Sequence, residues 1–206
     1  LNVGVVESIP KLVAAQVLQA AVEIDDPPRI SCQEAPLDAL LGELAIHRLD
    51  LVLSDQPMPA GLHVRAFNHP LGESDIAFFV RRRDARRLKA EFPACLDGEP
   101  FLLPAQGSAL RRRLEDWFEE QGIAPFPAAE FDDSALLKAF GEAGAGLFAA
   151  PTVIEEEICR MYRTSVIGRT DEIEERFYAI SPERVLRQTA VRHITDQARE
   201  QLLQLK

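Results

Sequence analysis

The segment from residue 130 to residue 152 constrains the fold most, because it alternates short apolar runs with signals for helix starts. The apolar run ending at Phe131 is followed by Asp132-Asp133-Ser134, residues that favour a helix N-terminus. A second run at 146–149 is followed by Pro151-Thr152, another helix start. Such alternation is typical of an α/β fold with a parallel sheet. Helix N-termini then line the carboxyl edge of the strands, where small ligands bind.

The rest of the chain repeats this alternation. The largely apolar run at 49–53, which Ser54-Asp55 ends, is typical of a parallel strand that is covered on both faces. We expect strands at 2–6, 29–33, 49–53, 63–67, 73–80, 101–103, 128–131, 146–149, 165–167 and 174–180. We expect helices at 10–23, 37–48, 83–92, 108–121, 134–142, 152–162 and 189–205.

Two consecutive β/α sets, followed by a closing strand and helix, predict two Rossmann-like lobes. Lobe I would comprise about 1–70 and 170–206, because the closing elements return to it. Lobe II would comprise about 71–169.

Composition limits what this segment can bind. The chain carries 33 acidic and 23 basic residues, for a net charge of -10. This charge argues against DNA binding by the segment itself, because phosphate contacts need clustered Lys and Arg. The two arginine clusters, at 81–87 and 111–113, are more typical of solvated helix faces. No apolar run approaches the ~20 residues of a membrane span, and we find no signal-peptide pattern.

The three cysteines, Cys32, Cys95 and Cys159, lie far apart and show no zinc-ligand spacing. We therefore expect reduced, mostly buried thiols in a cytoplasmic protein.

Several segments together resemble the effector-binding domain of LysR-type transcriptional regulators, over nearly all of the chain. The general pattern is Val3-Gly4-Val5 before Ser8-Ile9-Pro10, and then the segment 49–55. More specific segments resemble one branch of that family, the activators of sodium/proton antiporter expression. These are Pro93-Ala94-Cys95-Leu96, Phe131-Asp132-Asp133-Ser134-Ala135-Leu136, Lys138-Ala139-Phe140-Gly141 and Phe148-Ala149-Ala150-Pro151-Thr152.

The resemblance implies a type 2 periplasmic-binding-protein-like fold, with two crossover strands near 67–72 and 166–170. It implies an N-terminal winged helix-turn-helix that this chain does not contain, so that promoter DNA would be bound by the longer parent protein. It also implies a homodimer, a tetramer at full length, and a response to sodium or lithium. A hard cation of this kind takes oxygen ligands.

The candidate site residues lie at the ends of predicted strands or at the starts of predicted helices. Hydroxyls and N–H groups at the starts of helices favour a small anionic ligand, although ordinary helix capping explains the same residues without a ligand. Carboxylates at the same edge favour a cation. The predicted effector site lies between the lobes and comprises Ser8, Gln33, Glu34, Asp55, Gln106, Ser108, Asp133 and Thr152. Glu7, Asp132 and Ser134 are weaker candidates.

The predicted helix 10–23 is too apolar to be buried on one side only. We expect its residues Leu12, Val13, Val17 and Leu18 to form a dimer interface. The family resemblance implies that this helix meets the helix 134–142 of a partner chain.

Two other classes of function share the fold: a solute-binding protein of a transport system, and an enzyme. We find no nucleophile elbow, P-loop, GxGxxG or HExxH motif, and His47, His63, His69 and His193 lack metal-ligand spacing. The sequence therefore favours an effector-sensing and dimerisation domain of a transcriptional activator, with no covalent chemistry, no resident cofactor and no membrane partner.

Overall fold

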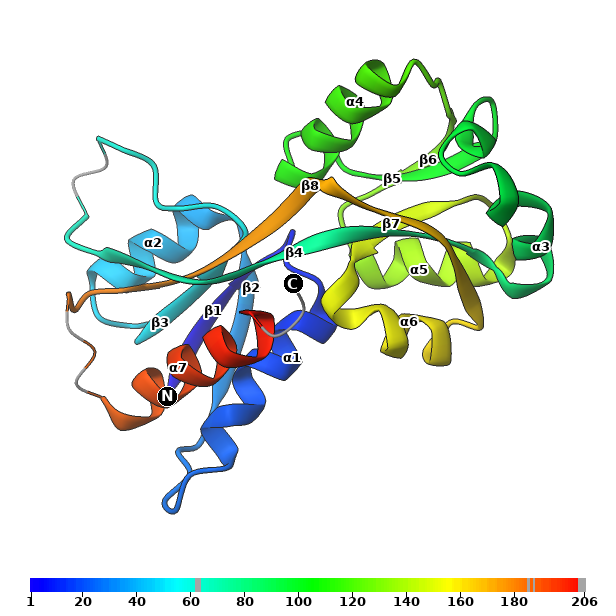
Figure 1. Ribbon diagram of the computed structural model, residues 1–206. Helices are drawn as coiled ribbons and strands as arrows, with labels where there is room; N and C mark the ends of the chain where they lie inside the picture. Colours follow the sequence, from blue (N-terminus) through cyan, green and yellow to red (C-terminus); the bar gives the residue numbers. More distant parts are fainter. Residues whose placement is uncertain (62–63, 185, 187, 204–206) are drawn as a thin grey trace. The chain divides into compact units, whose positions relative to one another are not determined.

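The computed structural model describes residues 1–61, 64–184, 186 and 188–203 (Figure 1). His63 lies outside these residues, so the predicted strand 63–67 falls only partly within them. The predicted end of the last helix, at residue 205, also lies outside them. The chain divides into two compact units. Unit 1 is built from Leu1–Glu73 and from the chain that begins at Arg176, and unit 2 is Ser74–Glu175.

Unit 1 contains a parallel sheet of the kind that the apolar runs predict. Its strands β1 (Asn2–Val6), β2 (Ser31–Ala35) and β3 (Leu51–Ser54) pair in the order β2-β1-β3. Gly4 is needed in β1 because a Cβ there would lie 2.8 Å from Leu40 Cδ2. Leu40 belongs to α2 (Leu37–Ala45), whose predicted apolar stripe is buried.

The first helix of unit 1 is covered by the last helix of the chain. Helix α1 (Lys11–Gln19) continues into the 3₁₀ turn η1 (Ala20–Val22), and both pack against α7 (Thr189–Leu203) (Figure 1). Within α1, Val13 and Val17 are only 1% and 4% exposed. This packing places the apolar side of α1 inside unit 1.

Unit 2 contains a second β/α set. Strands β5 (Pro100–Pro104) and β6 (Phe126–Phe131) are parallel, while β7 (Phe148–Pro151) pairs in antiparallel fashion with β4 (Phe67–Arg81). The helices are α3 (Ala85–Leu88), α4 (Ala109–Gln121), α5 (Ser134–Ala143) and α6 (Glu155–Met161).

Aromatic side chains from separate elements fill the core of unit 2. The Phe78 ring lies 5.1 Å from Trp117 and 5.2 Å from Phe92, measured between centroids. Gly168 permits this packing, since a Cβ there would lie 2.2 Å from Phe92 Cγ.

Two long strands, β4 (Phe67–Arg81) and β8 (Thr164–Ser181), run from one unit into the other. Strand β8 joins the predicted segments 165–167 and 174–180, because polar residues between them interrupt the apolar pattern. Strand β4 extends the predicted strand 73–80 back to Phe67, and the predicted strand 63–67 is wrong for residues 64–66, which are not in a strand. The chain changes unit after Glu73 and after Glu175, later than the predicted crossings at 67–72 and 166–170. In the hydrogen-bonded order β2-β1-β3-β8-β4-β7, the two strands are neighbours.

Several predicted helices are shorter or broken. The predicted helix 83–92 consists of η2 (Arg82–Asp84), α3 and η3 (Lys89–Glu91), and another 3₁₀ turn, η4 (Ala94–Leu96), follows. The predicted helix 152–162 begins with η5 (Thr152–Ile154). Hydrophobic spacing does not distinguish these tighter turns from an α-helix.

Two expectations drawn from composition can be compared with the structure. The cysteines are free, but Cys32 is exposed and Cys95 and Cys159 are half-buried, so the expectation of mostly buried thiols is wrong. Within the described part of the chain, no helix is long and apolar enough to span a membrane.

Candidate functional site

The carboxyl edge of the unit 1 sheet brings two predicted site residues to the same side of the sheet. Strand β1 ends at Val6, shortly before Ser8, and β3 ends at Ser54, directly before Asp55. Because β1 and β3 are parallel, with Val5 opposite Leu53, both residues leave the sheet at one edge. These are the positions where ligands bind in open α/β sheets.

Asp55 and Ser8 have polar atoms that the described residues leave unsatisfied. Asp55 is only 1% exposed, and its Oδ1 atom is buried without a hydrogen-bond partner in the described chain. Ser8 Oγ is buried and unpartnered in the same sense. Buried polar atoms without partners are rare and costly. A cation or a hydrogen-bond donor bound at this edge would remove the cost at Asp55.

Ser8 does not cap the first helix, contrary to the prediction. The N-cap position of α1 is Pro10, which has no side-chain oxygen to accept a hydrogen bond. The hydroxyl of Ser8 is therefore not consumed by capping.

Gln33 and Glu34 lie within β2 and not after it. They stand opposite Gly4 and Val5, because β2 begins two residues later than predicted. Glu34 is also ion-paired with Lys11. The expectation that Gln33 ends this strand and that Glu34 follows it is therefore wrong.

In unit 2, the predicted residues follow the ends of β5, β6 and β7. Ser108 caps α4 and accepts a hydrogen bond from the Arg111 N–H at 3.1 Å. Asp133 caps α5 through the N–H groups of Ala135 and Leu136, at 2.6 and 3.3 Å. Gln106 is exposed in the turn after β5. Ser108 and Asp133 thus have the ordinary capping role that was the alternative to ligand binding.

Thr152 and Ser134 differ from these capping residues. The Oγ1 atom of Thr152 lies 3.1 Å from the Ser74 hydroxyl, which also accepts a hydrogen bond from the Val153 N–H. Ser134 is the first residue of α5, as predicted, but Asp133 is the N-cap, and Ser134 Oγ is buried with no partner among the described residues.

Sequence reasoning missed a buried charge beside this edge. Lys138 is 3% exposed and donates from Nζ to the carbonyl oxygen of Ser134 at 3.0 Å. The only signal in the sequence is its place one turn after Ser134, on the face of α5 that also buries Leu137 and Gly141.

The predicted dimer residues divide into two groups. Val13 and Val17 are buried against their own unit, so they do not form a surface that a partner can reach. Leu12 and Leu18 are half-buried, and Val22 is 53% exposed.

Helix α5 of unit 2 has its own exposed apolar residues, Leu136 and Phe140, at 50% and 43% exposure. The Phe140 ring packs on Phe131 with a centroid distance of 4.8 Å. The two apolar surfaces, on α1 and on α5, remain open in the single chain.

Electrostatic effects near the candidate residues are modest. Partial burial, with a contribution from Glu34, raises the pKa of the Cys32 thiol. Burial, together with the charge of Asp133, raises the pKa of the Tyr162 phenol. Among the described residues, no group of three or more His, Cys, Asp or Glu side chains is placed to hold a metal ion.

Comparison with known proteins identifies relatives of the whole chain. The family model described as the LysR substrate binding domain matches residues 1–203. The transcriptional activator protein NhaR of Escherichia coli (strain K12) is 34% identical over 193 residues, which are 94% of this chain and 63% of that protein. NhaR of Shigella flexneri gives the same values. The chain thus spans less than two thirds of the length of these relatives.

Solved structures resemble the chain in fold. The apo regulatory domain of HypT from Salmonella typhimurium has a TM-score of 0.72 and 17% identity, covering 98% of this chain and 95% of that one. The reduced form of the regulatory domain of OxyR2 from Vibrio vulnificus has a TM-score of 0.70 and 16% identity, with the same coverage of both chains. At this identity the likeness concerns the fold alone, and it confirms the predicted fold class, which is like that of type 2 periplasmic binding proteins.

Proposed function

The chain belongs to the LysR substrate-binding domain family, and from this we propose that it is the sodium- or lithium-sensing domain of a dimeric transcriptional activator. Membership of the family does not favour the alternative of a transport solute-binding protein. We propose that the domain performs no covalent chemistry. Promoter DNA would be bound by a winged helix-turn-helix domain of the longer regulator.

The observation that supports cation sensing is the buried, unpartnered Oδ1 of Asp55. A hard monovalent cation takes carboxylate, hydroxyl and carbonyl oxygens as ligands. Ser8 supplies an unpartnered hydroxyl at the same edge of the sheet. Glu34 and Asp133 are weaker ligands in this proposal, because Lys11 pairs with the first and two backbone N–H groups bind the second.

The output of the domain would be a population shift. A cation that binds one conformation more tightly than another stabilises that conformation by its difference in affinity. In a dimer, this shift would move the attached DNA-binding domains. We assign association to the half-buried leucines of α1 and the exposed Val22 of η1 in one chain, and to the exposed apolar residues of α5 in a partner, with a tetramer at full length.

Thermal unfolding in sodium chloride and in potassium chloride, at equal ionic strength, tests the cation proposal. For a dissociation constant on the order of 1 mM, about 10 mM sodium should raise the melting temperature by about 3–6 °C relative to potassium. Asp55→Asn should abolish this difference.

Asp26→Asn is the matched control, because Asp26 is an exposed carboxylate of the same unit. This variant should keep the full response to sodium. Equal melting temperatures in the two salts for the wild-type chain would contradict the proposal, and so would an unchanged sodium response in Asp55→Asn.

A further inference from the structure

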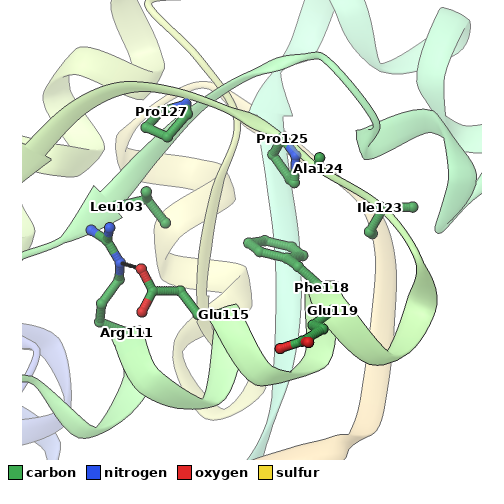
Figure 2. Close-up of a pocket in the computed structure, with 9 residues that line it drawn as sticks. All are labelled: Leu103, Arg111, Glu115, Phe118, Glu119, Ile123, Ala124, Pro125 and Pro127. Carbon is green, nitrogen blue, oxygen red and sulfur yellow. Dashed lines mark hydrogen bonds and ion pairs between the residues drawn. The ribbon is translucent and has the colours of Figure 1, made fainter.

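Unit 2 has a groove along α4, which is lined from Arg111 in the first turn of the helix to Glu119 near its end. The cavity measures about 270 Å³. Figure 2 shows α4 along one side of the groove and the segment 123–127 along the other. Its walls are mainly apolar, and its residues are Leu103, Arg111, Glu115, Phe118, Glu119, Ile123, Ala124, Pro125 and Pro127.

Arg111 lies at one end of this groove and is only 6% exposed, so the expectation that it belongs to a solvated helix face is wrong. Its Nε donates to Glu115 Oε1 at 2.5 Å, and its Nη2 donates to Glu130 Oε1 at 3.2 Å. Its Nη1 donates to the carbonyl oxygen of Pro104 at 3.1 Å. The guanidinium is therefore already matched by two carboxylates.

The remaining charge at the groove is negative. Glu119 lies one turn after Glu115 and lines the same groove, and the structure gives it no ion pair with any described residue. The groove is thus lined by two carboxylates, Glu115 and Glu119, and by one guanidinium that is already paired with Glu115 and Glu130. An approaching anion would be repelled by these carboxylates and would have to displace one of them from Arg111, whereas a cation would meet favourable charge.

We propose that this groove binds a small organic cation, namely a primary amine that carries a benzyl-sized apolar group. The apolar group would pack on Phe118, Leu103 and the prolines, in keeping with the mainly apolar walls of ligand sites. The ammonium group would lie between Glu115 and Glu119. This site is separate from the edge of unit 1 at Asp55, so the proposal does not depend on sodium sensing.

A ligand bound in this groove would affect the sheet edge of unit 2 through contacts of α4. Arg111 connects the groove to the Pro104 carbonyl at the end of β5, and its own N–H is the one that Ser108 caps. A ligand ammonium that competes for Glu115 would loosen the side-chain contacts of Arg111. The first turn of α4 should therefore respond to the ligand.

Two-dimensional amide NMR of the intact chain, titrated with benzylamine at constant ionic strength and pH 7, tests the proposal. Benzylamine should shift the amide signals of α4 and of 123–127, with a dissociation constant on the order of 1 mM. Benzoate and benzyl alcohol, which carry the same ring with a negative or a neutral group, should bind at least threefold more weakly. Benzoate binding as tightly as benzylamine would overturn the proposal.

Two variants locate the site without disturbing the Arg111 pair. Glu119→Gln should weaken benzylamine binding about two- to fivefold, as expected for one exposed charge pair. Glu120→Gln is the control, because Glu120 is exposed on the same helix and does not line the groove. Ala124→Trp should fill the groove and abolish the shifts. Equal effects of the two glutamine substitutions, or unchanged binding in Ala124→Trp, would contradict the proposed site.

Discussion

The indole Nε1 of Trp117 donates a hydrogen bond of 2.5 Å to Oε2 of Glu172, and this bond joins α4 to β8 within unit 2. Trp117 belongs to the aromatic core and is 3% exposed. The same carboxylate oxygen accepts a hydrogen bond from Gln121 Nε2 at 3.1 Å. A carboxylate on an exposed residue thus satisfies the one polar atom of the Trp117 side chain.

Glu172→Leu should lower the free energy of unfolding by about 1–3 kcal/mol, because it leaves the buried indole N–H without an acceptor. Glu172→Gln keeps an acceptor oxygen and should cost less than Glu172→Leu. Urea denaturation, followed by tryptophan fluorescence, measures both values. Equal stabilities of the two variants would show that the hydrogen bond contributes nothing.

Two substitutions on α1 should have different effects, although both add a carboxylate. Val17 is only 4% exposed, so Val17→Glu buries a charge and should unfold unit 1. Leu18 is only half-buried, so Leu18→Glu should preserve the fold and weaken association of the chain. Circular dichroism reports the fold, and sedimentation velocity reports the association. A wild-type chain that stays monomeric at high concentration would contradict the proposed interface.

Two helical glycines should respond oppositely to alanine. A Cβ at Gly141 would lie 2.4 Å from Phe148 Cε1, so Gly141→Ala should destabilise the chain by about 1–3 kcal/mol. A Cβ at Gly42 would meet no atom within 4 Å, so Gly42→Ala should stabilise it by about 0.5–1 kcal/mol. Thermal melts of the two variants, compared with the wild type, check the two signs.

The free energy of unfolding should decrease as the pH falls through the titration range of His69. Burial lowers the pKa of His69 below its usual 6.5, and its Nε2 lies 3.0 Å from Ser181 Oγ and 3.1 Å from the Glu183 carbonyl oxygen. Because the pKa of His69 is lower in the folded chain than in the unfolded chain, the unfolded chain binds more protons at a pH between the two pKa values. The contribution of neutral His69 to the free energy of unfolding is therefore fully present above pH 6.5 and is lost as the pH falls below that value.

The variant His69→Gln should reduce the pH dependence of the free energy of unfolding between pH 7.5 and pH 5.5. Urea midpoints across that interval provide the measurement, with His193→Gln as the control. A wild-type slope that persists in His69→Gln would assign the proton uptake to another group.

Much of the fold follows from local patterns. The helices predicted at 37–48 and 108–121 are present as α2 and α4. Their signals act within a few residues, namely the helical spacing of Leu40, Leu41 and Leu44 in α2 and the caps Ser108 and Gly122 in α4. The family was also readable from short segments. The long strands β4 and β8 were not, because strand length depends on neighbours that are distant in sequence.

The candidate site shows the same division between local and tertiary information. The sequence alone determined that Ser8 and Asp55 would follow parallel strands, and thus that they share a sheet edge. Only the tertiary structure decided that Asp55 Oδ1 is buried without a described partner, that Glu34 pairs with Lys11, and that α1 packs on α7. Burial and pairing depend on which elements meet in space, and no local pattern of residues specifies that.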